Sequence, residues 1–160
     1  MRTFKILQAL SIATLLVGCA TGPRFYDRYM DRRAQSLHTG LDLAGYIGEP
    51  VYAPRAGTVI GASPEFIMLE HDTGQKTSYY HIDSVTLERG ARVAQGQQIA
   101  RLALTGIQSY EDRRNIRVPH LHLELKTATD RGQDPESLKM TCDGLGGWRW
   151  PVGCGRPTGK

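Results

Sequence analysis

The sequence has little that favours a nucleic-acid-binding protein or a helical one. Its 160 residues carry a formal net charge of only +4, and no stretch combines clustered lysines and arginines with interleaved aromatic residues, so no nucleic-acid partner is expected. No solenoid repeat and no convincing long helical pattern are visible. With 40% hydrophobic residues and 18 glycines, the composition is that of a globular domain with appended segments.

Long hydrophobic runs are also scarce, and the clearest one lies at the N-terminus. Residues 1–18 combine a short basic region with an apolar run that is too short for a membrane span and typical of a signal peptide. The run ends in Leu16-Val17-Gly18-Cys19, which resembles the lipobox of bacterial lipoproteins. We therefore expect cleavage before Cys19, acylation of Cys19 as a stable membrane anchor, and a tether over residues 19–36. The residue after Cys19 is Ala20 rather than Asp, which in a Gram-negative cell resembles the pattern of lipoproteins destined for the outer membrane, so we expect an anchor there that faces the periplasm.

Cysteine is rare, and lipidation of Cys19 leaves only two of the three cysteines. Cys142 and Cys154 lie in a Gly/Pro-rich tail, residues 128–160, where they flank two tryptophans. Outside the cytoplasm they can form a disulfide that closes a short loop. In the chain-entropy description such a bond contributes up to about 3 kcal/mol.

Between these segments the residue pattern indicates β-structure. Short apolar runs are separated by glycine, proline and aspartate, as in residues 50–54, 57–60, 90–93 and 97–100. A hairpin is predicted from two runs, Phe66 to His71 and Lys76 to Ile82, joined by a turn at Asp72-Thr73-Gly74. The fold class expected is therefore all-β, an antiparallel sandwich or a barrel-like sheet.

One stretch, His120-Leu121-His122-Leu123-Glu124, carries the clearest chemical signal. In a β-strand successive side chains alternate between faces. The two histidines and Glu124 then share one face, and the leucines point into a core. Two histidines held side by side on an anchored strand indicate a metal or acid–base site, although a pair of structural, hydrogen-bonded histidines is the alternative.

A second segment supplies partners for these histidines. His38 and Asp42 are four residues apart, and both can face one side of an extended segment, with Gly40 between them where a side chain would crowd the space. Catalytic zinc takes three protein ligands and leaves a position for water. His38, Asp42 and one of His120 or His122 would form such a set. The remaining histidines could then move protons or stabilise charge.

These motifs together resemble the zinc metallopeptidases of the M23 family (lysostaphin and LytM type). The resemblance rests on His38-x-x-x-Asp42, Tyr80-His81 and Pro119-His120-Leu121-His122, and extends over residues 37–127, the predicted peptidase domain. It implies a sheet-rich fold with the site in a groove across one sheet. It also implies a zinc ion held by the residues His38, Asp42 and His122, with His81 and His120 as catalytic histidines that do not bind the metal.

The implied activity is hydrolysis of the peptide cross-links of bacterial peptidoglycan. An alternative is a non-catalytic LytM-type module that binds and activates cell-wall amidases. The sequence departs from the family pattern in a long loop, residues 107–119, which contains Arg113, Arg114 and Arg117. This loop is expected beside the substrate groove, where it would narrow the groove or simply be a solvated insertion. His71 falls at a family position but is interpreted as a structural histidine of the hairpin.

Overall fold

The fold is built from two antiparallel β-sheets that enclose one hydrophobic core. The computed structural model describes residues 22–25, 28, 30–31, 37–106 and 119–154. The predicted signal peptide, Cys19 and the loop over residues 107–118 lie outside these residues. Within them, no helix is long and apolar enough to cross a membrane.

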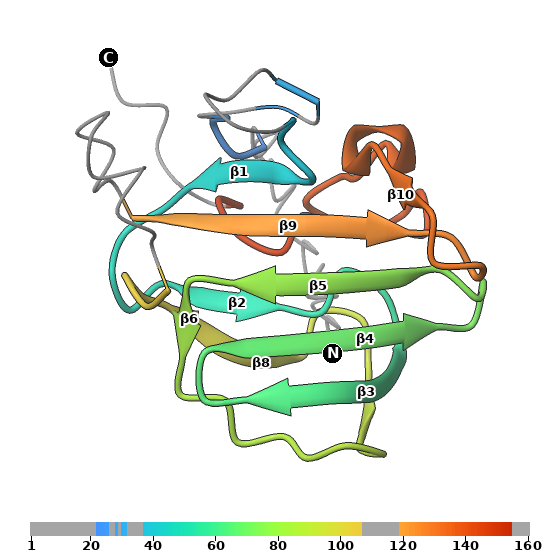
Figure 1. The fold of residues 1–160 in the computed structure, drawn as a ribbon, viewed down its shortest axis with the longest axis horizontal. Helices are drawn as coiled ribbons and strands as arrows, with labels where there is room; N and C mark the ends of the chain where they lie inside the picture. The colour runs from blue at the N-terminus through green and yellow to red at the C-terminus, as the bar shows by residue number, and fades with distance from the viewer. Residues whose placement is uncertain (1–21, 26–27, 29, 32–36, 107–118, 155–160) are drawn as a thin grey trace, which may run out of the picture.

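The larger sheet has seven strands, and its order differs from the order along the chain. Its neighbours run β1-β9-β5-β4-β3-β7, and β10 also pairs with β9 (Figure 1). The bounds of these strands are β1 Leu41–Ala44, β3 Gly57–Ser63, β4 Phe66–His71, β5 Lys76–Tyr80, β7 Arg92–Val93, β9 His120–Lys126 and β10 Gly132–Gln133.

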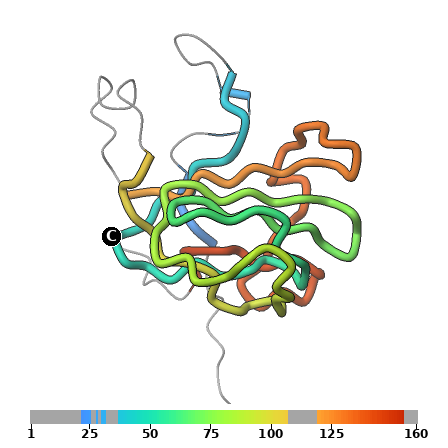
Figure 2. Tube along the Cα trace, turned by 60° about the horizontal axis from the view of Figure 1, so that its bottom comes forward, coloured from blue at the N-terminus to red at the C-terminus, as the bar shows by residue number. Residues whose placement is uncertain are grey.

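The smaller sheet has three strands and packs behind the larger one. Its order is β2-β8-β6, with bounds β2 Pro50–Tyr52, β8 Gln98–Leu102 and β6 Ile82–Asp83. It lies behind the larger sheet in Figure 1 and below it in Figure 2, together with the C-terminal residues in red. The only helical element in the described part of the chain is a short 3-10 turn, η1 Pro135–Leu138. The prediction of an antiparallel all-β fold is confirmed.

The core between the sheets is made by the apolar faces of alternating strands. Leu121 and Leu123 of β9 and Leu41 and Leu43 of β1 are fully buried. They pack with residues of the smaller sheet such as Leu102. Burying such side chains stabilises the fold by about 1.5–3 kcal/mol each. This packing fixes the orientation of β9, and therefore of the side chains on its other face.

The predicted hairpin forms, but its second strand is shorter than expected. β4 and β5 pair around the turn after His71. The run that was predicted to continue to Ile82 stops at Tyr80, because His81 adopts a positive φ of 62°. Ile82 then pairs with Leu102 in the other sheet. His81 is thus the point at which the chain leaves one sheet for the other.

The C-terminal segment covers one end of the core. The predicted disulfide between Cys142 and Cys154 is present. Trp148, which lies inside the closed loop, is buried and meets His71 edge-on, with 4.9 Å between ring centroids. His71 is therefore enclosed by the tail as well as by its own hairpin.

His71 gives a testable dependence of stability on pH. Its Nδ1–H donates to the Ala56 carbonyl and its Nε2 faces the Thr77 hydroxyl, 2.7 Å away. Burial lowers the pKa of His71. Below pH ~6.5 the unfolded chain takes up a proton at this residue and the folded chain does not, so acidification favours unfolding.

We therefore expect the free energy of unfolding of the wild type, relative to that of His71→Gln, to fall as the pH is lowered from 7.5 to 5. Urea denaturation at several pH values measures this difference. A difference that does not change with pH would contradict the assignment of a neutral buried His71.

Candidate metal centre

The candidate site is formed where β1 and β9 pair. Asp42 of β1 lies opposite His122 of β9 in the antiparallel register, and Ala44 lies opposite His120. Because the leucines on either side of His122 point into the core, the histidines project from the other face of the sheet. His38 precedes β1 and reaches the same face.

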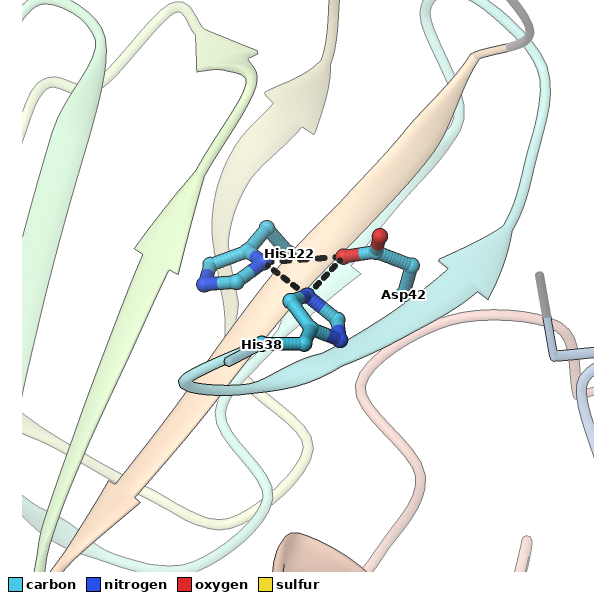
Figure 3. Close-up of side chains that lie close together, drawn as sticks. All are labelled: His38, Asp42 and His122. Carbon is cyan, nitrogen blue, oxygen red and sulfur yellow. Dashed lines mark hydrogen bonds and ion pairs between the residues drawn. The ribbon is translucent and has the colours of Figure 1, made fainter. Parts of the chain in front are cut away.

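Three atoms that could bind a metal, one each from His38, Asp42 and His122, converge there, as Figure 3 shows. His38 Nε2 is 3.1 Å from Asp42 Oδ1 and 3.0 Å from His122 Nδ1, and His122 Nδ1 is 2.8 Å from Asp42 Oδ1. His38 and Asp42 are buried and His122 is partly exposed. The three atoms therefore form a nearly equilateral triangle, and the residue at one corner, His122, is partly exposed.

This triangle fits a zinc ion. Two imidazole nitrogens and a carboxylate oxygen are a typical ligand set for catalytic zinc. Ligands at about 2.1 Å from a tetrahedral ion are separated from one another by about 3.4 Å, close to the three distances here. The family resemblance implied that His38, Asp42 and His122 belong together, and the fold brings these three residues together.

The electrostatics of the triangle also favour a cation. Burial would raise the pKa of Asp42, but hydrogen bonds with His122 and His38 hold it far below its usual range. Burial would lower the pKa of His122, but its interactions with Asp42 and Glu124 raise it to about 9. Asp42 is thus ionised, and positive charge beside its carboxylate is strongly stabilised.

Each histidine of the triangle contacts a further acceptor through its other ring nitrogen. His38 Nδ1 lies 2.8 Å from the carbonyl oxygen of Arg28. His122 Nε2 lies 3.5 Å from Glu124 Oε1, and Glu124 in turn accepts a hydrogen bond from Thr39 Oγ1 at 2.7 Å. Such acceptors orient metal-binding imidazoles and increase their basicity.

His81 and His120 form a second pair beside the triangle. Their rings meet edge-on with 4.7 Å between centroids, and His120 Nε2 is 4.0 Å from Asp42 Oδ1. His81 Nδ1 lies 2.8 Å from the Thr105 carbonyl, which can only accept, so this nitrogen carries the proton. In the neutral ring the lone pair is then on Nε2. His81 also has a positive φ of 62°. At a residue other than glycine this is a strained backbone conformation, of a kind often found at functional sites.

Gly40 gives a direct test of how tightly the site is built. A Cβ at this position would lie 2.5 Å from the Leu123 carbonyl oxygen and 2.8 Å from His122 Nε2. We expect Gly40→Ala to push β1 away from β9 and to weaken zinc binding roughly tenfold or more, a typical cost of disturbing the residues around a metal.

Competition with a chromophoric chelator measures the zinc affinity of this variant. Gly61→Ala in β3 is the matched control, because its Cβ would approach no neighbour closer than 3.5 Å. Equal zinc affinities for the two variants would contradict the close packing inferred at Gly40.

Sequence reasoning missed two groups at this site, the carbonyl oxygens of Arg28 and Thr105. Every residue has a backbone carbonyl, so no residue pattern could identify these two. The arginines of the predicted loop and Cys19 lie outside the described residues.

Comparison with known proteins places the motifs in a wider context. The sequence pattern of Peptidase family M23 matches residues 36–135. The peptidoglycan DD-endopeptidase ShyB of Vibrio cholerae is 34% identical over 93 residues, which cover 55% of this chain and 20% of that protein. A lipoprotein NlpD/LppB homolog of Pseudomonas aeruginosa is 34% identical over 77 residues, covering 44% of this chain and 26% of the relative.

A solved structure shows the same likeness in three dimensions. The zinc-containing peptidase from Vibrio cholerae superimposes with a TM-score of 0.55 at 27% identity, over 73% of this chain and 39% of that one. The chain spans about a fifth to a quarter of the length of the two relatives described above. The similarity to these two relatives is therefore confined to one domain of each.

Proposed function

The chain belongs to peptidase family M23, and we propose that it is a zinc metalloendopeptidase that hydrolyses peptide cross-links of bacterial peptidoglycan. The observation that carries the proposal is the triangle of His38, Asp42 and His122, whose ligand atoms all lie within 4.8 Å of one another. The naming of one relative as a peptidoglycan DD-endopeptidase supports the substrate class. The zinc reported for the Vibrio cholerae peptidase supports the metal.

In this proposal the triangle holds the metal and the second histidine pair handles protons. When bound, zinc polarises the scissile carbonyl and makes water acidic enough to act as a nucleophile near neutral pH. His81, with its proton on Nδ1 and its lone pair on Nε2, is suited to accept the proton of that water. His120 is then the donor to the oxygen of the tetrahedral intermediate.

The alternative is a non-catalytic module that activates cell-wall amidases. Two observations support this alternative: the similarity to an NlpD/LppB homolog and the inserted loop over residues 107–119. The family resemblance implies that modules of that type typically lose some of the metal ligands. Here all three ligands are present and converge, which favours the enzyme.

We further propose that the protein is a lipoprotein of the cell envelope, anchored at Cys19 and facing the periplasm from the outer membrane. The lipobox supports this, and so does the naming of a relative as a lipoprotein. Replacing Cys19 with serine is expected to release the protein from the membrane fraction, while the wild type incorporates labelled palmitate.

Digestion of purified sacculi tests the activity. The mature chain, loaded with one equivalent of Zn²⁺, is expected to convert cross-linked muropeptides to monomers, and a chelator should stop the reaction. Chromatography of the released muropeptides identifies the bond that is cut. An unchanged sacculus, together with stimulation of an added amidase, would favour the activator instead.

A further inference from the structure

A segment that precedes the family domain forms hydrogen bonds with His38. We call the described residues Gly22–Phe25, Arg28, Met30 and Asp31 the N-terminal strap; they lie before residues 36–135, which match the family. The Met30 amide donates to the His38 carbonyl at 2.8 Å, and the His38 amide donates to the Asp31 carbonyl at 3.0 Å. The His38 ring donates from Nδ1 to the Arg28 carbonyl at 2.8 Å. The strap thus holds both the backbone and the ring of a candidate metal ligand.

The strap is itself fixed to the domain at its beginning. Phe25 forms an antiparallel bridge with Leu43, and the Arg24 carbonyl accepts a hydrogen bond from the Ala44 amide at 2.8 Å. These contacts continue the larger sheet beyond β1, which would otherwise be its edge. Phe25 also contacts the Trp150 ring, with 5.7 Å between centroids.

A second anchor lies at Arg28, next to the carbonyl that His38 contacts. The guanidinium binds both carboxylate oxygens of Glu136 in η1, and it lies 4.8 Å from the centre of the Phe25 ring. The Arg28 amide donates to Asp31 Oδ2 at 2.7 Å, which closes a turn. Both hydrogen bonds start from Nη1 of Arg28, and hydrogen bonds between two charged groups are stronger than those between neutral ones.

The ring contact decides which nitrogen of His38 faces the site. A carbonyl oxygen can only accept a hydrogen bond, so His38 Nδ1 carries a proton, and in the neutral ring that binds a metal the lone pair is on Nε2. Nε2 is the atom that faces Asp42 and His122. A ring released from the Arg28 carbonyl could adopt the other tautomer or turn away, and either change would remove a ligand.

We propose that the N-terminal strap is part of the metal centre, with the Arg28 carbonyl as the group that positions His38. This inference rests on the proposed zinc function for its effect on metal binding. It makes the segment between the predicted lipid anchor and the domain a determinant of zinc affinity, and not only a tether.

Variants of the anchor test the proposal in the full mature chain. Arg28→Ala and Glu136→Gln are expected to raise the zinc dissociation constant about tenfold, the lower end of the effects seen when groups that orient metal ligands are removed. The exchanged pair, Arg28→Glu with Glu136→Arg, is expected to restore affinity to within about threefold of the wild type. Asp72→Asn is the matched control, since it weakens another arginine–carboxylate pair, with Arg55, away from the site.

A second readout uses the zinc-free protein and does not depend on the proposed function. The His38 Nδ1 proton is expected to give a slowly exchanging NMR signal in the wild type and in Asp72→Asn, and to lose that protection in Arg28→Ala and Glu136→Gln. Zinc affinity equal to that of the control, or an unchanged proton signal, would overturn the proposal. If the wild type binds no zinc, the proposed function fails, and the proton signal alone decides whether the strap orients His38.

Discussion

Replacing His122 with alanine is expected to abolish hydrolysis of sacculi and to lower zinc affinity by at least about a hundredfold. Only two protein ligands, His38 and Asp42, would remain, whereas catalytic zinc is held by three. Elemental analysis after dialysis should find about one zinc per wild-type chain and almost none in the variant. Muropeptide chromatography should find no product above the protein-free background.

The environment of Asp42 requires a second variant beside this one. Asp42 is buried, and His122 supplies one of its hydrogen bonds. Because an uncompensated buried charge destabilises a protein, His122→Ala is also expected to melt at a lower temperature. His122→Asn keeps a polar group next to Asp42 and should lose zinc with a smaller change in melting temperature. Wild-type rates of digestion by either variant would end the interpretation of His122 as a ligand.

The part of this site that the sequence predicts is the part set by local alternation. The period of two along a strand puts His120 and His122 on one face and the leucines on the other, and the leucines are indeed fully buried. His38 and Asp42 share a face for the same reason. The cost of a side chain at Gly40 was also predictable, because a segment that carries two ligands on one face has little room between them.

Local residue patterns could not predict which strands pair with each other. β1 lies beside β9 although Asp42 and His122 are 80 residues apart, and a residue pattern within one strand does not identify the partner strand. The break at His81 was missed because Ser78-Tyr79-Tyr80-His81-Ile82 has a continuous strand-like composition. The positive φ of His81 accompanies a hydrogen bond from its ring to the carbonyl of Thr105, 24 residues further along the chain and beyond the end of β8. Long-range contacts of this kind are fixed only when the whole core assembles.

The second large effect is expected from His120→Ala, which should separate catalysis from metal binding. His120 is fully buried next to His81, and its Nε2 is 4.0 Å from Asp42 Oδ1, outside the triangle of ligand atoms. The variant is therefore expected to bind one zinc with an affinity within about threefold of the wild type. Loss of a group that donates or accepts a proton in the reaction typically lowers the rate by about 10²–10⁴-fold.

Comparison with the other histidines makes this prediction specific. His81→Ala should behave like His120→Ala, and the double variant should lose little more than either alone, because groups that act as a unit are not additive. His71→Gln is the matched control: it removes a buried histidine outside the site, so it should lower stability and retain activity at a temperature where it stays folded. If His120→Ala loses zinc to the same extent as His122→Ala, the two histidines of β9 share one role. The division of the site into three ligands and two proton-handling histidines would then be wrong.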